Sequence, residues 1–191
     1  MDNNQPYKTG KTKDKALNIY HENDPENPRE WDNLGVMVCT HKRYTLGDKH
    51  TFNFDNHNSW NEVEKAIKRE YKTAVILPLF LYDHSWITMR TTSFNDGWDS
   101  GQVGFIYVTK EDIRKEYNVK RISPKLLEKI KGYLINEVET YDQYLTGEVY
   151  RFEVTDLNGV ELDSCGGFFG TDFKMNGLAD YIDKELIESL T

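Results

Sequence analysis

The residues best suited to chemistry gather at the ends of two apolar segments. Asp83 and His84 follow one apolar run, and Asp99 and Gln102 precede a β-branched run. Imidazole titrates near neutral pH, so His84 beside a carboxylate could act as a general acid or base. A nucleophilic triad within 83–85 is disfavoured, because neighbours on a strand point to opposite faces. The structural alternative is a polar turn that joins two strands.

Tryptophans stand next to several of these polar residues. Trp31 precedes Asp32, and Trp98 precedes Asp99. Aromatic side chains beside polar groups are favoured at protein interfaces, and core packing is the alternative for each of them. Loops held by a rigid scaffold concentrate binding groups, so we predict that these loops meet at one edge of a sheet. The predicted binding patch comprises Trp31, Asp32, Asp83, His84, Trp98, Asp99 and Gln102.

Other residues that could bind a metal or act as a nucleophile lack the spacing that such chemistry needs. His41, His50 and His57 show neither the helical pairing of a zinc site nor a Cys-x-x-Cys partner. The acidic segment 24–32 attracts cations but lacks the calcium-loop glycine, so metal binding there is left open. Cys165 precedes two glycines, which allow close approach of a ligand or a simple bulge. We expect no catalytic residue and no cofactor.

Composition excludes several classes of protein. The chain has 191 residues, 24 basic and 32 acidic, for a net charge of −8. This balance disfavours direct nucleic-acid binding, which needs clustered basic residues, and DNA mimicry would need a larger acidic excess. Two cysteines make no disulfide framework. No charged-then-apolar leader opens the chain, and the longest apolar run, 74–82, is too short for a bilayer. We expect a cytoplasmic protein without a membrane segment.

Alternation and turn residues predict the strands. Strands are expected over 16–20, 34–39, 75–81, 86–92 and 104–108. Asn158 and Gly159 separate two further strands, and this pair is the strongest short signal for a two-residue hairpin. We therefore predict a hairpin between about residues 148 and 165.

Capping residues and apolar periodicity predict the helices. Ser59, Thr109 and Ser123 each stand where a side-chain oxygen would cap a helix. Behind them, apolar residues recur at three- and four-residue spacing. The inward faces should carry Trp60, Val63, Ile67 and Tyr71, then Ile113 and Tyr117, then Leu126, Ile130, Leu134 and Val138. A last helix should carry Leu178, Ile182 and Leu186, with Asn176 as its cap.

These elements predict an α+β protein. Hairpin-joined strands with interspersed helices favour one antiparallel or mixed sheet with about four helices packed against it. A single domain should cover 15–191, because a chain of this length forms one core. Residues 1–14 are polar and should form a flexible tail.

Six blocks of the sequence carry a family resemblance: 27–35 (NPREWDNLG), 43–48 (RYTLGD), 81–85 (LYDHS), 98–108 (WDSGQVGFIYV), 139–147 (ETYDQYLTG) and 163–165 (DSC). Together they resemble a widespread family of small uncharacterised proteins encoded by phages and mobile elements of Gram-positive bacteria. The resemblance runs roughly from residue 27 to residue 170, which is most of the chain. The chain departs from the family in having Trp86 where glycine follows His-Ser, and Gly166 where tryptophan follows Ser-Cys. The resemblance implies a phage-related origin and supplies no activity.

Two hypotheses about function follow from these observations. The first is a non-enzymatic binding protein that acts on a host or defence macromolecule, with a protein as the expected partner and inhibition as one outcome. The second is a small metal-dependent or acid–base hydrolase that uses Asp83, His84 and Asp99. The sequence leaves the oligomeric state and the identity of the partner open.

Overall fold

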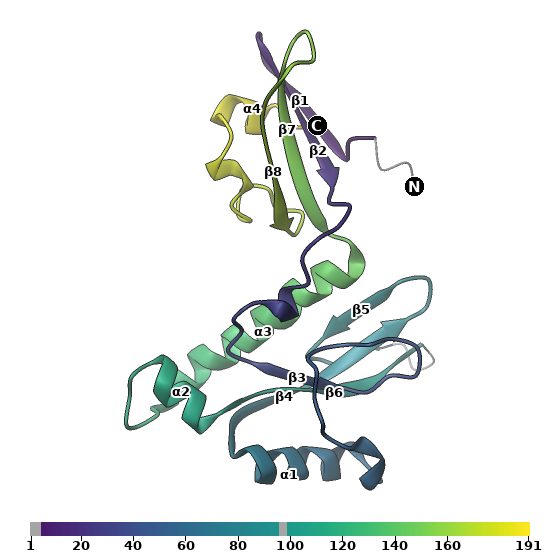
Figure 1. Ribbon diagram of the computed structural model, residues 1–191, viewed down its shortest axis with the longest axis vertical. Helices are drawn as coiled ribbons and strands as arrows, with labels where there is room; N and C mark the ends of the chain where they lie inside the picture. The colour runs from purple at the N-terminus through teal and green to yellow at the C-terminus, as the bar shows by residue number, and fades with distance from the viewer. Residues whose placement is uncertain (1–4, 96–98) are drawn as a thin grey trace. The chain divides into compact units, whose positions relative to one another are not determined.

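The chain divides into two compact units, each built around an antiparallel sheet (Figure 1). The computed structural model describes residues 5–95 and 99–191. Unit 1 is formed by the two ends of the chain, up to Asn27 and from Gln143 onward, and unit 2 by Pro28–Asp142. The α+β class is confirmed, but the prediction of one sheet is wrong, since the described residues form two sheets of four strands. The alternation of apolar and polar residues predicts where strands form, but it does not predict which hairpins pair into the same sheet. One domain over 15–191 stays a prediction.

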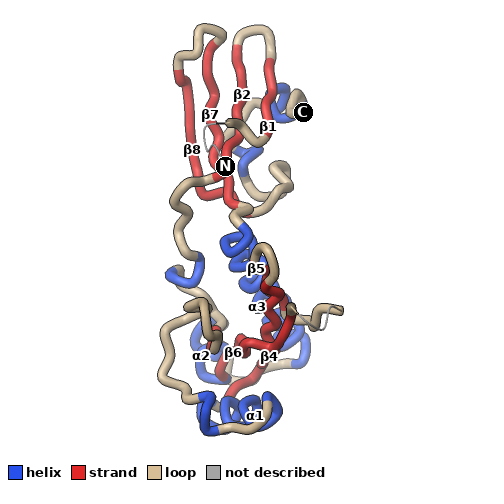
Figure 2. Tube along the Cα trace, turned by 90° about the vertical axis from the view of Figure 1, so that its right-hand side faces the viewer, coloured by secondary structure: helices blue, strands red, loops and turns tan. Residues whose placement is uncertain are grey.

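Unit 1 joins the N-terminal and C-terminal strands in one sheet, which Figure 2 shows side by side. Residues 8–11 were expected in a polar tail but pair as a strand, from Lys8 opposite Ile19 to Lys11 opposite Ala16. A polar segment can pair in this way because the hydrogen bonds between strands are formed by backbone N–H and C=O groups. The order is β1-β2-β7-β8, with β1 (Lys8–Lys11), β2 (Lys15–His21), β7 (Val149–Asp156) and β8 (Glu161–Phe169).

The C-terminal segment packs on the apolar side chains of this sheet. It forms a short 3-10 helix, η3 (Leu178–Asp180), and α4 (Lys184–Glu188), rather than the one continuous helix expected. Leu178, Ile182 and Leu186 are nevertheless all buried in the unit 1 core, as their spacing predicts. The Asn176 Oδ1 atom accepts the Leu178 N–H at 3.1 Å, but the residue in the N-cap position of η3 is Gly177 rather than the predicted Asn176.

The predicted hairpin joins β7 to β8, but its turn differs from the one expected. Asp156 N–H donates to the Val160 carbonyl at 2.9 Å, and Gly159 N–H donates to the Asp156 carbonyl at 3.1 Å. Only Gly159 takes a positive φ, of 84°, so Asn158 is not in the two-residue turn that needs two such residues. The Asp156 carboxylate accepts the N–H groups of Asn158 and Val160, both at 2.8 Å. These bonds stabilise a longer loop and lower the pKa of Asp156.

Unit 2 has a sheet of order β3-β6-β4-β5 between helices on both faces (Figures 1 and 2). Phe105 and Tyr107 pack in one cluster with α1 side chains. The intervening Ile106 points to the other face, where it approaches Leu134 of α3 around Gly35. The strands are β3 (Val36–Cys39), β4 (Thr73–Asp83), β5 (Ile87–Arg90) and β6 (Ser100–Thr109). The helices are η1 (Pro28–Glu30), η2 (Phe54–Asn56), α1 (Trp60–Tyr71), α2 (Lys110–Glu116) and α3 (Pro124–Thr146), whose last residues belong to unit 1.

The predicted helix signals are confirmed in unit 2. The Ser59 hydroxyl accepts the Glu62 N–H at 3.3 Å, and the Thr109 hydroxyl accepts the Asp112 N–H at 3.1 Å. Ser123 caps α3 in the same way, through the Leu126 N–H at 3.2 Å. The side chains that recur every fourth residue along α3, at 130, 134 and 138, are buried. α3 is thereby held by its apolar face, and its other faces are left for the site described next.

Candidate functional site

The structure brings three of the predicted site residues together at one end of the unit 2 sheet. Asp83 N–H donates to the Asp99 carbonyl at 2.8 Å, which places the ends of β4 and β6 side by side. His84 Nδ1 lies 3.2 Å from an Asp99 carboxylate oxygen. The side chains of this pair are 62% and 45% exposed, so water screens the interaction.

Asp83 itself is held in a local ion-pair cluster. It pairs with the Arg43 guanidinium and accepts the Tyr44 hydroxyl at 3.2 Å, and His41 Nε2 lies 3.8 Å away. The hydrogen bond from Arg43 lowers the pKa of the Asp83 carboxyl, against the opposite effect of partial burial. Asp83 therefore stays charged and positions the loop that carries His84.

The remaining predicted residues do not all join this pair. The Gln102 amide donates to the Gly104 carbonyl at 3.2 Å on its own strand, and Trp98 lies outside the described residues. Trp31 and Asp32 line a groove whose described lining contains none of Asp83, His84 and Asp99. The single predicted patch is thus divided between two places, because the segment with Trp31 is fastened to α3.

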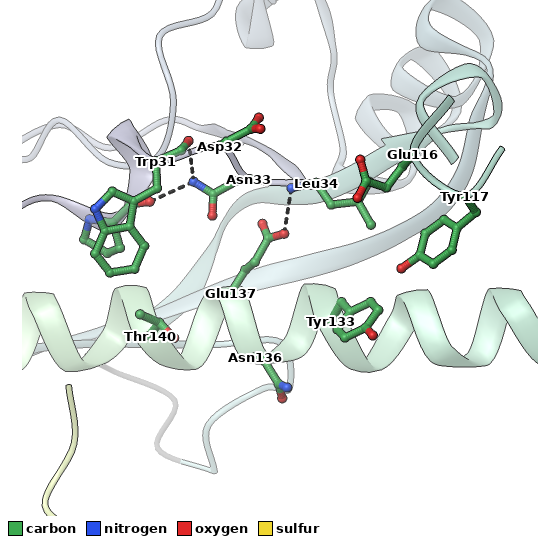
Figure 3. Close-up of a pocket in the computed structure, with 11 residues that line it drawn as sticks. Trp31, Asp32, Asn33, Leu34, Glu116, Tyr117, Tyr133, Asn136, Glu137 and Thr140 are labelled. Carbon is green, nitrogen blue, oxygen red and sulfur yellow. Dashed lines mark hydrogen bonds between the residues drawn. The ribbon is translucent and has the colours of Figure 1, made fainter. Parts of the chain in front are cut away.

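The groove with Trp31 is the second candidate site (Figure 3). It encloses about 420 Å³ between the segment after η1, the end of α2 and one side of α3. Trp31 lies toward one end of the groove, and Tyr117 and Tyr133 lie toward the other (Figure 3). The lining consists of Pro28, Trp31, Asp32, Asn33, Leu34, Glu116, Tyr117, Tyr133, Asn136, Glu137 and Thr140.

A buried arginine holds the groove in shape. Arg29 donates Nε and Nη2 to the Asp48 carboxylate, both at 2.8 Å, and Nη1 to Glu137 at 3.1 Å. Its Nη2 also donates to the Gly35 carbonyl at 2.6 Å. Burial alone would lower the pKa of Arg29, but the bonds to both carboxylates outweigh it and raise the pKa. This charged network ties the segment after η1 to β3 and α3.

Glu137 fastens the same segment from the helix side. Its Oε1 accepts the Leu34 and Gly35 N–H groups at 3.0 and 3.1 Å. A Cβ atom at Gly35 would lie 2.6 Å from a Leu134 methyl carbon, so only glycine lets the backbone come this close to α3. The groove is therefore built before any ligand arrives, which lowers the entropic cost of binding.

The groove combines exposed aromatic rings with negative charge. Trp31 is 44% exposed and Tyr133 is 39% exposed. Asp32 and Glu116 add carboxylates, and no lysine or arginine stands among the described residues of the lining. The Lys129 Nζ atom lies 5.3 Å from the Tyr133 ring centroid and 5.5 Å from that of Tyr117. These rings thus already attract a cation of the chain itself.

Sequence reasoning missed the α3 side of the groove. Tyr133, Asn136, Glu137 and Thr140 follow at helical spacing beside the apolar stripe of α3. An exposed tyrosine in that polar stripe was the available signal. Glu116 and Tyr117 lie at the end of α2, and no sequence signal placed them against residues 31–34.

The histidine and cysteine candidates serve other contacts. His50 Nε2 lies 2.8 Å from the Cys39 carbonyl, and the His57 ring stacks on Phe52. Over residues 5–95 and 99–191, no three His, Cys, Asp or Glu side chains form a group suited to a metal ion. Cys165 is partly buried against the unit 1 core.

The fold and the groove define an α+β protein with two antiparallel sheets and a preformed acidic, aromatic groove. No family model matches the chain, and neither a curated protein nor a solved structure matches it. None of the described helices has both the length and the hydropathy that a bilayer crossing requires.

Proposed function

We propose that the chain is a non-enzymatic binding protein, encoded by a phage or mobile element, whose groove binds a basic segment of a host or defence protein. The observation that carries the proposal is the lining of the groove, where exposed Trp31 and Tyr133 accompany Asp32 and Glu116. A lysine or arginine of the partner can lay its aliphatic stem on the rings while its charged head reaches the carboxylates. The phage or mobile-element origin rests on the sequence resemblance.

The chemistry of the groove favours binding over catalysis. Glu137 is the best-positioned carboxylate of the groove, but it already bonds to Arg29 and to two backbone N–H groups. Its role is therefore to stabilise the side of the groove formed by residues 34 and 35. Trp and Tyr are the residue types that most often dominate binding energy at protein interfaces. The net charge of −8 would also speed the approach of a basic partner.

Photo-crosslinking from the groove tests the proposal. The full chain carries p-benzoylphenylalanine at position 136, inside the groove, and is expressed in a Gram-positive host. A matched chain carries it at position 131, which lies about 140° around the same helix. We expect one discrete protein adduct from position 136 that disappears in the Trp31→Ala background, and no such adduct from position 131.

The adduct must also map to a basic segment of the captured protein. An Asp32→Asn, Glu116→Gln variant should weaken capture, because it removes the charges of both carboxylates while keeping the size of the side chains. Equal adducts from both positions, or capture unaffected by Trp31→Ala, would contradict the proposal.

A second candidate function rests on the His84–Asp99 pair. A carboxylate 3.2 Å from an imidazole orients the ring, as in acid–base hydrolysis. The test is hydrolysis of simple ester and phosphodiester substrates, with and without divalent ions, by the parent chain and His84→Ala. Activity that is lost in the variant would support a hydrolase that uses Asp83, His84 and Asp99. Activity that survives the substitution, or an inactive parent chain, would contradict it.

A further inference from the structure

A second cavity of unit 2 has the opposite charge to the groove. It encloses about 390 Å³ and combines an apolar floor with four basic side chains, and no acidic residue is among its described lining. The floor is formed by Ala74, Ile122 and Leu127, and the basic residues are Lys110, Arg114, Lys120 and Arg121.

The fold gathers these four cations from two short segments. Lys110 and Arg114 are one turn apart on α2, so they share one side of the helix. The chain then reverses at Asn118, whose φ is 49°, and the Val119 N–H donates to the Arg114 carbonyl at 3.1 Å. This reversal brings the following two basic residues back to the cavity.

The four cations have no anionic partner within the described parts of the chain. Some basic residues elsewhere in these parts are paired, such as Lys15 with Asp183 and Lys184 with Glu188. Among residues 5–95 and 99–191, no ion pair involves Lys110, Arg114, Lys120 or Arg121, and their side chains form no hydrogen bond there. Four like charges around one cavity repel one another, and an anion at its centre would relieve that repulsion. In a chain with a net charge of −8, such a concentration of positive charge is a local exception.

We propose that this cavity binds a small phosphorylated ligand, with its phosphate held by Arg114 and Arg121 and flanked by Lys110 and Lys120. Guanidinium groups present planar forks that match phosphate oxygens, and ammonium groups add charge. The volume suits a small molecule, and the floor can cover its apolar part. An extended nucleic acid is disfavoured, because four cations neutralise only a short stretch of backbone and the rest of the chain repels it.

Titration with pyrophosphate, followed by amide chemical shifts of the full chain, tests this inference. We expect saturable shifts confined to residues 110–122 and their neighbours. An Arg114→Gln, Arg121→Gln variant should bind at least about tenfold more weakly, since two charge-assisted contacts are lost. The matched control, Lys49→Gln with Lys65→Gln, removes the same charge from exposed residues outside the lining and should bind like the parent.

Thermal unfolding of both variants should match the parent, because all the substituted residues are exposed. An Arg114→Lys, Arg121→Lys variant should bind with intermediate affinity. Lysine keeps the positive charge, but it lacks the planar guanidinium that donates two parallel hydrogen bonds to a phosphate. The proposal is overturned if pyrophosphate gives no saturable shift, if the control loses as much affinity, or if sulfate binds equally well. A short DNA duplex that bound more tightly than pyrophosphate would also overturn it and indicate a nucleic-acid surface.

Discussion

Replacing Arg29 with methionine should destabilise unit 2 strongly. The substitution removes the guanidinium that bonds to Asp48 at 2.8 Å and to Glu137 at 3.1 Å. Methionine fills most of the space but leaves two carboxylates, whose side chains are only 20% and 15% exposed, without their cation. Removing one partner of a buried ion pair costs roughly 3–5 kcal/mol, because the remaining charge is uncompensated.

Urea denaturation followed by tryptophan fluorescence measures this loss of stability in unit 2, which contains Arg29. All four tryptophans of the sequence fall within 28–142, so their emission reports the unfolding of unit 2. The control is Arg69→Met on the exposed side of α1, which should change the unfolding free energy by no more than about 0.5 kcal/mol. Far-UV circular dichroism of both variants in buffer checks that they fold.

Neutralising Asp48 and Glu137 should restore part of the unfolding free energy that Arg29→Met removes. An Arg29→Met, Asp48→Asn, Glu137→Gln variant keeps one acceptor oxygen in each of the two side chains and removes both charges. It should be more stable than Arg29→Met alone by about 1 kcal/mol or more. If Arg29→Met costs less than about 1 kcal/mol, or if the triple variant is no more stable than the single one, the network does not hold the groove as argued.

Four further predictions concern stability and the two candidate sites. Leu134→Ala should cost roughly 2–5 kcal/mol in urea denaturation, because the side chain is fully buried, and an unchanged midpoint would contradict the α3 packing. Burial raises the pKa of Asp142 despite its bonds from Met89 and Thr88, so its stabilising contribution is complete at low pH and is lost as pH rises through the raised value. Asp142→Asn should therefore gain stability relative to the parent between pH 3 and pH 7, and an equal difference at both pH values would refute this. Gly159→Ala should cost about 1 kcal/mol through its positive φ, as a thermal melt can show, whereas an unstrained turn would tolerate it. His84→Ala with Asp99→Ala should leave stability within about 0.5 kcal/mol and crosslinking at the groove intact, whereas loss of crosslinking would place the pair in the binding site.

Local signals in the sequence determined most of the individual elements. Ser59, Thr109 and Ser123 cap the helices that their positions predict, because a capping bond needs only residues within one turn. The buried stripe of α3 followed from spacing alone, since 130 and 134 must share a helical face. The hairpin around Gly159 was likewise predictable, although the hydrogen bond that the Val160 N–H donates to the Asp156 carboxylate favours a longer turn.

Contacts between distant parts of the sequence decided the rest. β2 pairs with β7 from Lys15 opposite Asp156 to His21 opposite Tyr150, and no local pattern specifies that partner. The same holds for Trp31, which lines a groove with α3 because Arg29 bonds to Glu137, 108 residues away. The sequence by itself therefore determined most of the longer helices and strands and the acidic character of this protein, whereas β1 and the break between η3 and α4 were not predicted. Only the tertiary structure decided that two sheets form and where charged side chains meet, because long-range pairing depends on backbone edges and buried charges that no sequence window contains.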